Sequence, residues 1–177
     1  MDSTLSFKKI RIVVDETFIV DAMENHDPMC ENTSYLDVET GEVVTITTEV
    51  ADIVETDETS AVETLPDWQR DEVEIAKKVL GDESSRYVAI PRLESHEGFR
   101  FMEEFVDQLK NDNVAECLAQ ALRKSRPFAR FKDVMSEWPE VEQQWYAFKN
   151  KKVRQEVADF LASIEHERIE LTLPTRP

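Results

Sequence analysis

The sequence predicts an α+β fold in which a small, mainly antiparallel sheet with an N-terminal hairpin packs against four or five helices in a mostly helical C-terminal half. Three observations predict this fold class. β-Branched and aromatic residues flank a glycine-containing turn before residue 50, and apolar residues recur at helical spacing from residue 67 onward. A length of 177 residues with 41% hydrophobic residues is enough to bury a core. We expect a single domain over residues 1–177.

The first half is predicted to begin with a strand, a short helix and a hairpin. Residues 8–14, KKIRIVV, are rich in β-branched side chains and predict a short strand or the lead-in to a helix. Asp15 fits the N-cap of a short helix, because apolar residues follow it at helical spacing. Strands are then predicted at 33–38 and 42–49, on either side of a turn that contains a glycine.

An acidic loop or connector is expected at about 51–66, separating an acidic N-terminal α/β part from a helical C-terminal part. Residues 1–85 carry 6 Lys and Arg against 22 Asp and Glu, a net charge of −16. Residues 86–177 carry 15 against 16, a net charge of −1. The acidic half could steer a basic protein partner toward the chain, and the alternative is an ordinary solvated surface.

The second half opens with a helix, a strand and two more helices. The first helix is expected to start at Pro66 and end at Gly81. Residues 86–90, RYVAI, predict a buried strand. Ser95 is the expected N-cap of the next helix, and residues 114–124 place their apolar side chains on one face of another.

The C-terminal part is predicted to contain two proline-initiated helices and a final strand. Pro127 and Pro139 fit the first turns of these helices, because the missing amide proton costs nothing there. The apolar residues of the second helix change phase along the segment, so we expect a break or bend near Asn150. Residues 168–173, RIELTL, alternate like a strand and could pair with the N-terminal strands.

The segment from Arg123 to Phe148 concentrates cations and large rings. No acidic residue occurs between Cys117 and Lys132, and five cations are candidate binding residues: Arg123, Lys124, Arg126, Arg130 and Lys132. A second basic cluster contains Lys149, Lys151, Lys152 and Arg154. Such cations and rings could bind nucleic acid or a phosphorylated ligand. In the alternative, the rings form core and the cations pair with carboxylates of the first half.

The overall charge of −17 disfavours nucleic acid as the partner, because the body of the protein repels phosphates beyond the local patch. Screening beyond about 8 Å at physiological salt weakens this objection without removing it.

No motif dictates a reaction. The chain has three glycines and no phosphate-binding glycine loop, and its two cysteines, Cys30 and Cys117, have neither CxxC spacing nor a nearby histidine. An enzyme centred on His96, Glu97 and Glu103 would require these side chains to converge. We therefore predict no cofactor and no metal, and the sequence favours a non-enzymatic chain over an enzyme without deciding between them. No apolar run is long enough to span a membrane, and a cytoplasmic location is expected.

Several short elements occur in an order that is similar to a known family. They are Tyr35–Asp37, Gly41–Val43, Tyr87–Pro91, the helix start with Ser95, Glu97, Phe99, Met102, Glu103 and Phe105, then FARFKD at 128–133 and WYAF at 145–148. Over residues 12–165 the chain resembles uncharacterised protein family 0158, bacterial proteins of unassigned function. Ala129 stands where the family usually has arginine, and residues 125–127 stand where it usually has small, Gly-containing sequence. The resemblance implies a fold and leaves function open.

The sequence thus predicts a non-enzymatic cytoplasmic protein, an acidic protein-interaction module. Its binding face would involve the basic-aromatic segment or the acidic half. The alternative is a nucleic-acid or phosphorylated-ligand binder that uses residues 123–132. The sequence does not define the oligomeric state.

Overall fold

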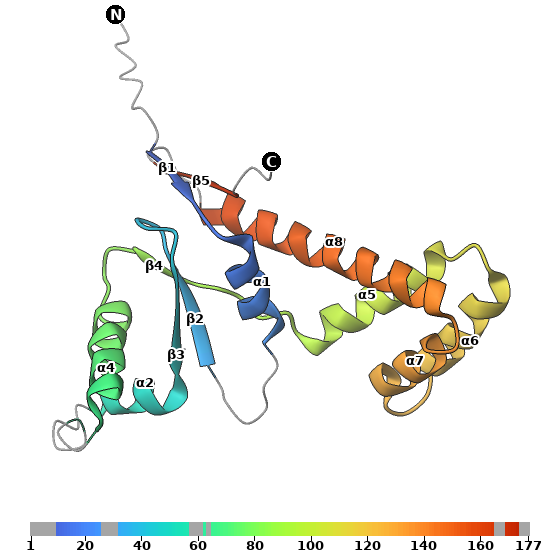
Figure 1. Cartoon of the computed structure of the whole chain (residues 1–177), viewed down its shortest axis with the longest axis horizontal. Coiled ribbons are helices and arrows are strands. Elements are labelled where there is room, and N and C mark those ends of the chain that lie inside the picture. The colour runs from blue at the N-terminus through green and yellow to red at the C-terminus, as the bar shows by residue number, and fades with distance from the viewer. Residues whose placement is uncertain (1–9, 26–31, 57–61, 63–64, 165–168, 174–177) are drawn as a thin grey trace, which may run out of the picture. The chain divides into compact units, whose positions relative to one another are not determined.

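The computed structural model describes residues 10–25, 32–56, 62, 65–164 and 169–173, which form an α+β fold (Figure 1). The chain divides into two compact units. Residues 1–92 with 157–177 form the first, here called the acidic unit, and residues 93–156 form the second, here called the helical unit. The expected single domain over residues 1–177 stays a prediction.

A three-stranded antiparallel sheet organises the acidic unit. β2 (Asn32–Asp37) lies between β3 (Val43–Thr47) and β4 (Tyr87–Ala89), and Tyr35 pairs with Val44 on one side and Ala89 on the other. The predicted hairpin is therefore confirmed. Its turn contains Gly41, whose φ of 81° is a left-handed conformation that glycine adopts without steric cost.

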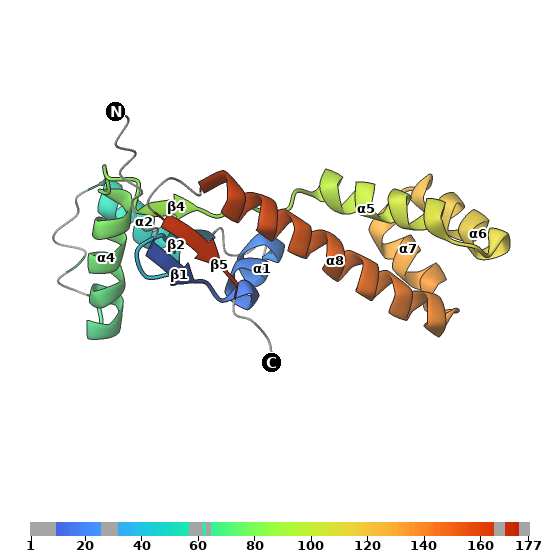
Figure 2. The ribbon, with the colours of Figure 1, turned by 90° about the horizontal axis from the view of Figure 1, so that it is seen from above.

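A separate pair of parallel strands joins the two ends of the described chain. β1 (Ile10–Val13) pairs with β5 (Ile169–Thr172), and the two strands lie side by side in both views (Figure 1 and Figure 2). Of the two alternatives for the first segment, the strand is correct, and the pairing of the final strand with it is confirmed over these residues, while residues 8, 9 and 168 lie outside the described part of the chain. Ile12 and Leu171, which are partners in the register, are buried.

Three helices complete the described part of the acidic unit before β4. They are α1 (Glu16–Glu24), α2 (Thr48–Glu55) and α4 (Asp67–Leu80). Asp15 is the N-cap of α1 as predicted, since its side chain accepts a hydrogen bond from the Thr17 amide at 2.9 Å. α2 and α4 pack on the sheet through one apolar cluster, made of Ile46, Val50, Val73, Ala76 and Val79.

The helical unit contains α5 (Ser95–Gln108), α6 (Asp112–Leu122), α7 (Pro127–Met135) and most of α8 (Pro139–Ile164), whose residues from Val157 onward belong to the acidic unit. Aromatic rings form the centre of this unit. The Phe105 and Trp145 ring centroids lie 5.3 Å apart, and those of Phe131 and Trp145 lie 5.2 Å apart, both in edge-to-face geometry. Such pairs add about 0.5–1.5 kcal/mol each beyond their burial.

Local predictions differ from the structure at several places. The strand expected to reach residue 49 ends at Thr47, whose hydroxyl caps α2, so the expected loop begins as a helix. Residues 57–61 and 63–64 of that loop lie outside the described residues. β4 is partly exposed rather than buried, and it is an edge strand among the strands that the structure describes.

Two helix predictions also need correction. α5 is capped by Glu94 rather than Ser95, one residue earlier than expected. The Glu97 carboxylate accepts a hydrogen bond from the Glu94 amide at 2.8 Å, which completes a capping box. α8 runs through Asn150 without a break. The apolar residues before and after Asn150 lie on different sides of one continuous helix, so the buried side changes along α8 while the backbone is not interrupted.

Candidate functional site

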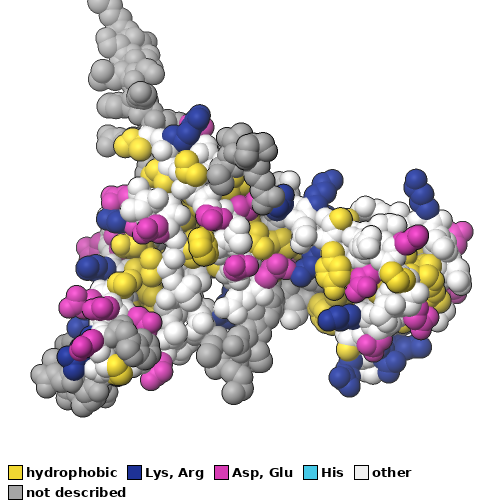
Figure 3. Space-filling view, viewed as in Figure 1, with side chains coloured by type: hydrophobic (Ala, Val, Ile, Leu, Met, Phe, Trp, Pro, Cys, Tyr) yellow, Lys and Arg dark blue, Asp and Glu magenta, His cyan; other side chains and the backbone are white. Residues whose placement is uncertain are grey.

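The five cations predicted as binding residues all lie in the helical unit and are all exposed. Arg123 is the C-cap of α6, Lys124 and Arg126 lie in the loop that follows, and Arg130 and Lys132 lie on α7. None forms an ion pair with a described carboxylate of the helical unit. Figure 3 shows Lys and Arg side chains gathered along the edge of this unit where α7 lies. The expected pairing with carboxylates of the first half stays a prediction.

The loop between α6 and α7 is held in a strained conformation. Arg126 has a φ of 58° and a ψ of 55°, a left-handed conformation that costs a residue with a Cβ about 1–2 kcal/mol. It directly precedes Pro127, which begins α7 as predicted. The turn brings the Ser125 carbonyl to the Arg130 side chain, whose Nε donates a hydrogen bond to it at 2.9 Å.

A hollow of about 240 Å³ lies between α6 and α7, and we call it the α6–α7 hollow. It is lined by Cys117, Gln120, Ala121, Lys124, Arg130, Asp133 and Val134. Two of the five predicted cations therefore share one depression, together with one carboxylate.

The remaining cations do not join this hollow. Arg123 lines a different depression of about 440 Å³ between α5 and α6, with Glu103 and Asp107 among the other lining residues. Lys132 lies one turn after Phe128 on α7, and side chains four residues apart are neighbours on a helix surface. The structure thus divides the predicted basic segment into separate local environments.

The rings of the segment divide between the core and the surface. Phe131, Met135 and Trp145 are buried, as their spacing predicts. Phe128, which the same spacing assigned to the core, is 42% exposed. It lies in the first turn of α7 at the margin of the buried face, where its ring lies beside Gly98 and meets the Phe99 ring edge-on at a centroid distance of 6.5 Å. An aromatic ring is therefore available beside the cations.

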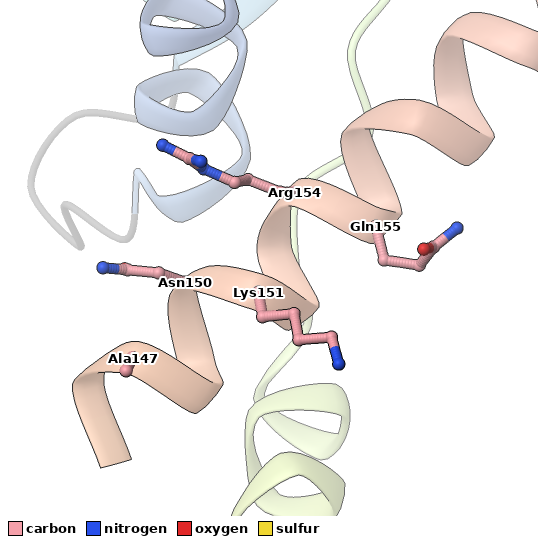
Figure 4. Close-up of a pocket in the computed structure, with 5 residues that line it drawn as sticks. All are labelled: Ala147, Asn150, Lys151, Arg154 and Gln155. Carbon is pink, nitrogen blue, oxygen red and sulfur yellow. The ribbon is translucent and has the colours of Figure 1, made fainter. Parts of the chain in front are cut away.

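The second basic cluster, on α8, is a different kind of surface. Lys152 forms an ion pair with Glu104, and its ammonium lies 5.8 Å from the Phe101 ring centroid. Nearby, Ala147, Asn150, Lys151, Arg154 and Gln155 line a depression of about 490 Å³. Figure 4 shows Asn150 and Arg154 extending to one side and Lys151 and Gln155 to the other, so these side chains do not converge on one ligand atom.

The acidic unit contains an ionic network that spacing did not predict. Arg86 donates from Nε and a terminal nitrogen to the two Asp37 carboxylate oxygens, at 3.0 and 2.7 Å, and a second terminal nitrogen lies 2.7 Å from Glu39. Burial opposes the charge of Asp37, but hydrogen bonds from Arg86 and from the Glu39 amide outweigh it, so the pKa of Asp37 lies below its ordinary value. The carboxyl is ionised and its partner is fixed.

Asp82 organises the turn that leads into β4. It accepts hydrogen bonds from the Ser84 hydroxyl and amide, the Arg86 amide and the Tyr87 amide, at 2.5 to 3.1 Å. These bonds, the Ser84 hydroxyl first, lower the pKa of Asp82 to about 2. An aspartate two residues before a serine is a local signal for such a turn, so this role could have been predicted.

The candidate catalytic group is not assembled. Glu97 is used in the capping box of α5, and Glu103 lines the α5–α6 depression, which neither His96 nor Glu97 reaches. Across the part of the chain that the structure describes, no group of three or more His, Cys, Asp or Glu side chains could hold a metal ion. The described helices include none with the length and apolar character needed to cross a membrane.

Comparison with known proteins places the chain in a family. Residues 10–172 match the family described as "Uncharacterised protein family (UPF0158)", and the chain belongs to this family, as its motifs predicted. It is similar to the UPF0158 protein PA5073 of Pseudomonas aeruginosa, with 30% identity over 83 residues. The similarity covers 47% of this chain and 54% of that relative, about half the length of each. No solved structure matches the chain.

Proposed function

We propose that the chain is a non-enzymatic protein-interaction module that binds an acidic segment of a partner protein. The binding face is the basic-aromatic surface, defined here as Arg123, Lys124, Arg126, Arg130, Lys132 and Phe128. The observation that carries the proposal is the exposure of all five cations, without an ion pair to described carboxylates of their unit, beside a ring that is 42% exposed.

The composition of this surface supports a protein partner. Arginine and aromatic residues are enriched at the energetic centres of protein interfaces, where a partly buried ring fills a pocket and a guanidinium binds a carboxylate. Phe128 and the adjacent cations provide both chemistries on one helix. Because Phe128 already contacts Phe99, its ring is positioned before a partner arrives.

The strained Arg126 adds support from the backbone. Glycine would occupy a φ of 58° without steric cost, yet the position carries an arginine with an exposed side chain. Strained backbone persists where the surrounding structure enforces it and occurs often at functional sites. A role for the Arg126 side chain in binding would explain why arginine rather than glycine occupies this left-handed position.

Nucleic acid or a phosphorylated ligand is the second candidate, and the same exposed cations favour it. A nucleic-acid surface normally has a strong local excess of positive charge. The excess here is confined to the basic-aromatic surface, since the helical unit as a whole contains 11 Lys and Arg against 12 Asp and Glu, a net charge of −1. This balance favours contacts with a few partner carboxylates over contacts with a long phosphate backbone.

A basic partner for the acidic unit is a further proposal, which rests on charge alone. That unit contains 10 Lys and Arg against 26 Asp and Glu. A field of this sign would speed the approach of a basic protein, and the effect would weaken as salt rises.

The test compares two double variants with the same change in charge. R130E/K132E reverses two cations of the basic-aromatic surface, and K77E/K78E reverses two exposed lysines on α4. A partner is first captured from a nuclease-treated lysate with the wild-type chain and then purified. We expect its affinity, measured by calorimetry, to fall at least about tenfold for R130E/K132E, because charged hydrogen bonds are lost, and to change little for K77E/K78E.

Equal losses in the two variants would point to overall charge and would reject the binding face. Loss of capture after nuclease treatment, together with direct binding of an oligonucleotide, would favour the nucleic-acid candidate instead.

A further inference from the structure

We infer that the α6–α7 hollow is a carboxylate-selective clamp that holds one Asp or Glu side chain of the partner between Lys124 and Arg130. The inference rests on the proposed function and identifies the residues that would recognise the acidic segment. Both cations line the hollow, both are exposed, and neither has an ion pair to a described carboxylate of its unit.

Arg130 is oriented for this role before a ligand arrives. Its Nε donates to the Ser125 carbonyl at 2.9 Å, which uses one edge of the guanidinium and restricts its rotation. The terminal N–H groups have no partner within the described residues. Guanidinium groups bind carboxylates through two parallel hydrogen bonds, and a side chain that is already ordered loses less entropy when it does so.

The size of the hollow favours one side chain of the partner as the ligand. Pockets for drug-sized ligands measure about 300–1,000 Å³, and this one measures about 240 Å³. The lining includes Ala121 and Val134, which can contact the methylene groups of an acidic side chain. One Asp or Glu side chain fits in this space, whereas a whole nucleotide would extend beyond it.

Asp133 reduces the advantage that a doubly charged phosphate would otherwise have over a carboxylate in this hollow. It lines the same hollow as Lys124 and Arg130, so an anion bound there lies near one negative charge as well as two positive ones. Asp133 lowers the net positive charge of the lining, and this weakens the binding of a phosphate dianion more than that of a carboxylate, because the interaction energy scales with the charge of the ligand. Asp133 can also accept a hydrogen bond from an amide next to the bound side chain, which a peptide has and a free phosphate lacks.

Cys117 gives a direct readout, because it is partly exposed and lines the hollow. The experiment uses the full chain with Cys30→Ser, so that Cys117 is the remaining thiol, and measures its rate of alkylation by iodoacetamide. Three probes are compared at constant ionic strength: an N-acetyl tetraglutamate amide, inorganic phosphate and a short single-stranded oligonucleotide. We expect the peptide to slow alkylation and phosphate and the oligonucleotide to have little effect.

Variants then locate the contact. K124Q and R130Q each remove one clamp cation, and we expect each to raise the peptide concentration for half-protection about tenfold. K110Q removes one charge from an exposed lysine of the same unit that does not line the hollow, and we expect no more than a twofold change, since a solvent-exposed charge outside the site is largely screened. D133N is expected to increase protection by phosphate relative to the peptide.

Several outcomes would overturn the clamp. In the wild type, these are no protection of Cys117 by the peptide, or protection by phosphate as strong as by the peptide. In the variants, they are a change in half-protecting concentration that is equal for K110Q and the two clamp variants, or an unchanged ratio of phosphate to peptide protection in D133N. If a captured partner is lost with R130E/K132E but retained with K124Q and R130Q, the clamp is wrong and the proposed function stands. If the peptide protects Cys117 but the R130E/K132E substitutions weaken the binding of no captured partner, the proposed function is wrong.

Discussion

Arg86 binds Asp37 through two hydrogen bonds, at 3.0 and 2.7 Å, between residues that lie 49 positions apart in the chain. Asp37 ends β2 and is only 4% exposed, while Arg86 immediately precedes β4. The Arg86 carbonyl also accepts a hydrogen bond from the Val38 amide at 2.9 Å. Side chain and backbone together therefore hold the loop before β4 against the end of β2.

Arg86→Leu is expected to lower the free energy of unfolding, because it leaves the Asp37 carboxylate buried without its cation. Removing one partner of a buried pair costs far more than removing one partner of an exposed pair. The matched control is Arg11→Leu, whose side chain is 67% exposed and whose contact with Glu170 is long, at 3.4 Å. Urea denaturation should give a loss at least about twice as large for Arg86→Leu. Equal losses would show that the Asp37 pair contributes no more than a surface pair.

The lowered pKa of Asp82 makes the free energy of unfolding depend on pH in a specific range. Its pKa is lowered from an ordinary value of 3.8 to about 2 in the folded chain, so the ionised form stabilises the fold above the ordinary value. This contribution is lost as pH falls from about 4 to about 2, when the carboxyl becomes protonated. Asp82→Asn should therefore reduce stability at pH 6, and its difference from the wild type should narrow toward pH 2. Denaturation at a series of pH values checks this, and a constant difference would contradict it.

Phe131 and Phe128 lie one turn apart on α7 and should respond very differently to truncation. Phe131 is 1% exposed and contacts Trp145, so Phe131→Ala should cost about 3–5 kcal/mol of folding free energy. Phe128 is 42% exposed, so Phe128→Ala should cost about 1 kcal/mol or less. Calorimetric unfolding measures both. A large loss for Phe128→Ala would assign that ring to the core and remove it from the basic-aromatic surface.

These two phenylalanines also show how far periodicity could predict the site. Spacing placed both on the apolar side of one helix, and it was correct for Phe131 because that position lies at the centre of the buried face. Phe128 lies at the margin of that face, and its exposure depends on where α5 ends its contact with α7, which spacing does not encode. The exposed ring was therefore missed, although the neighbouring cations were identified.

Most of the fold was predictable because its signals are local. The β2–β3 turn, the Asp15 cap and the proline-initiated starts of α7 and α8 each depend on a few adjacent residues. The Asp37–Arg86 pair was not predictable, because the chain has 38 acidic residues and sequence alone does not select which one meets Arg86. The α6–α7 hollow was missed for the same reason, since it combines residues from two helices.

Gly41 and Gly98 provide opposite predictions for the same substitution. Gly41 has a φ of 81°, and a Cβ there would collide with the Val13 carbonyl oxygen, so Gly41→Ala should cost at least about 1–3 kcal/mol from backbone strain alone. Gly98 lies inside α5, and a Cβ there would meet the Phe128 ring at 3.4 Å, an ordinary contact distance. Gly98→Ala should therefore stabilise the chain by about 0.5–1 kcal/mol, because alanine loses less backbone entropy in a helix. Urea denaturation of the two variants measures the change in the free energy of unfolding for each. A loss of stability in Gly98→Ala would show that Phe128 cannot accommodate even one methyl group.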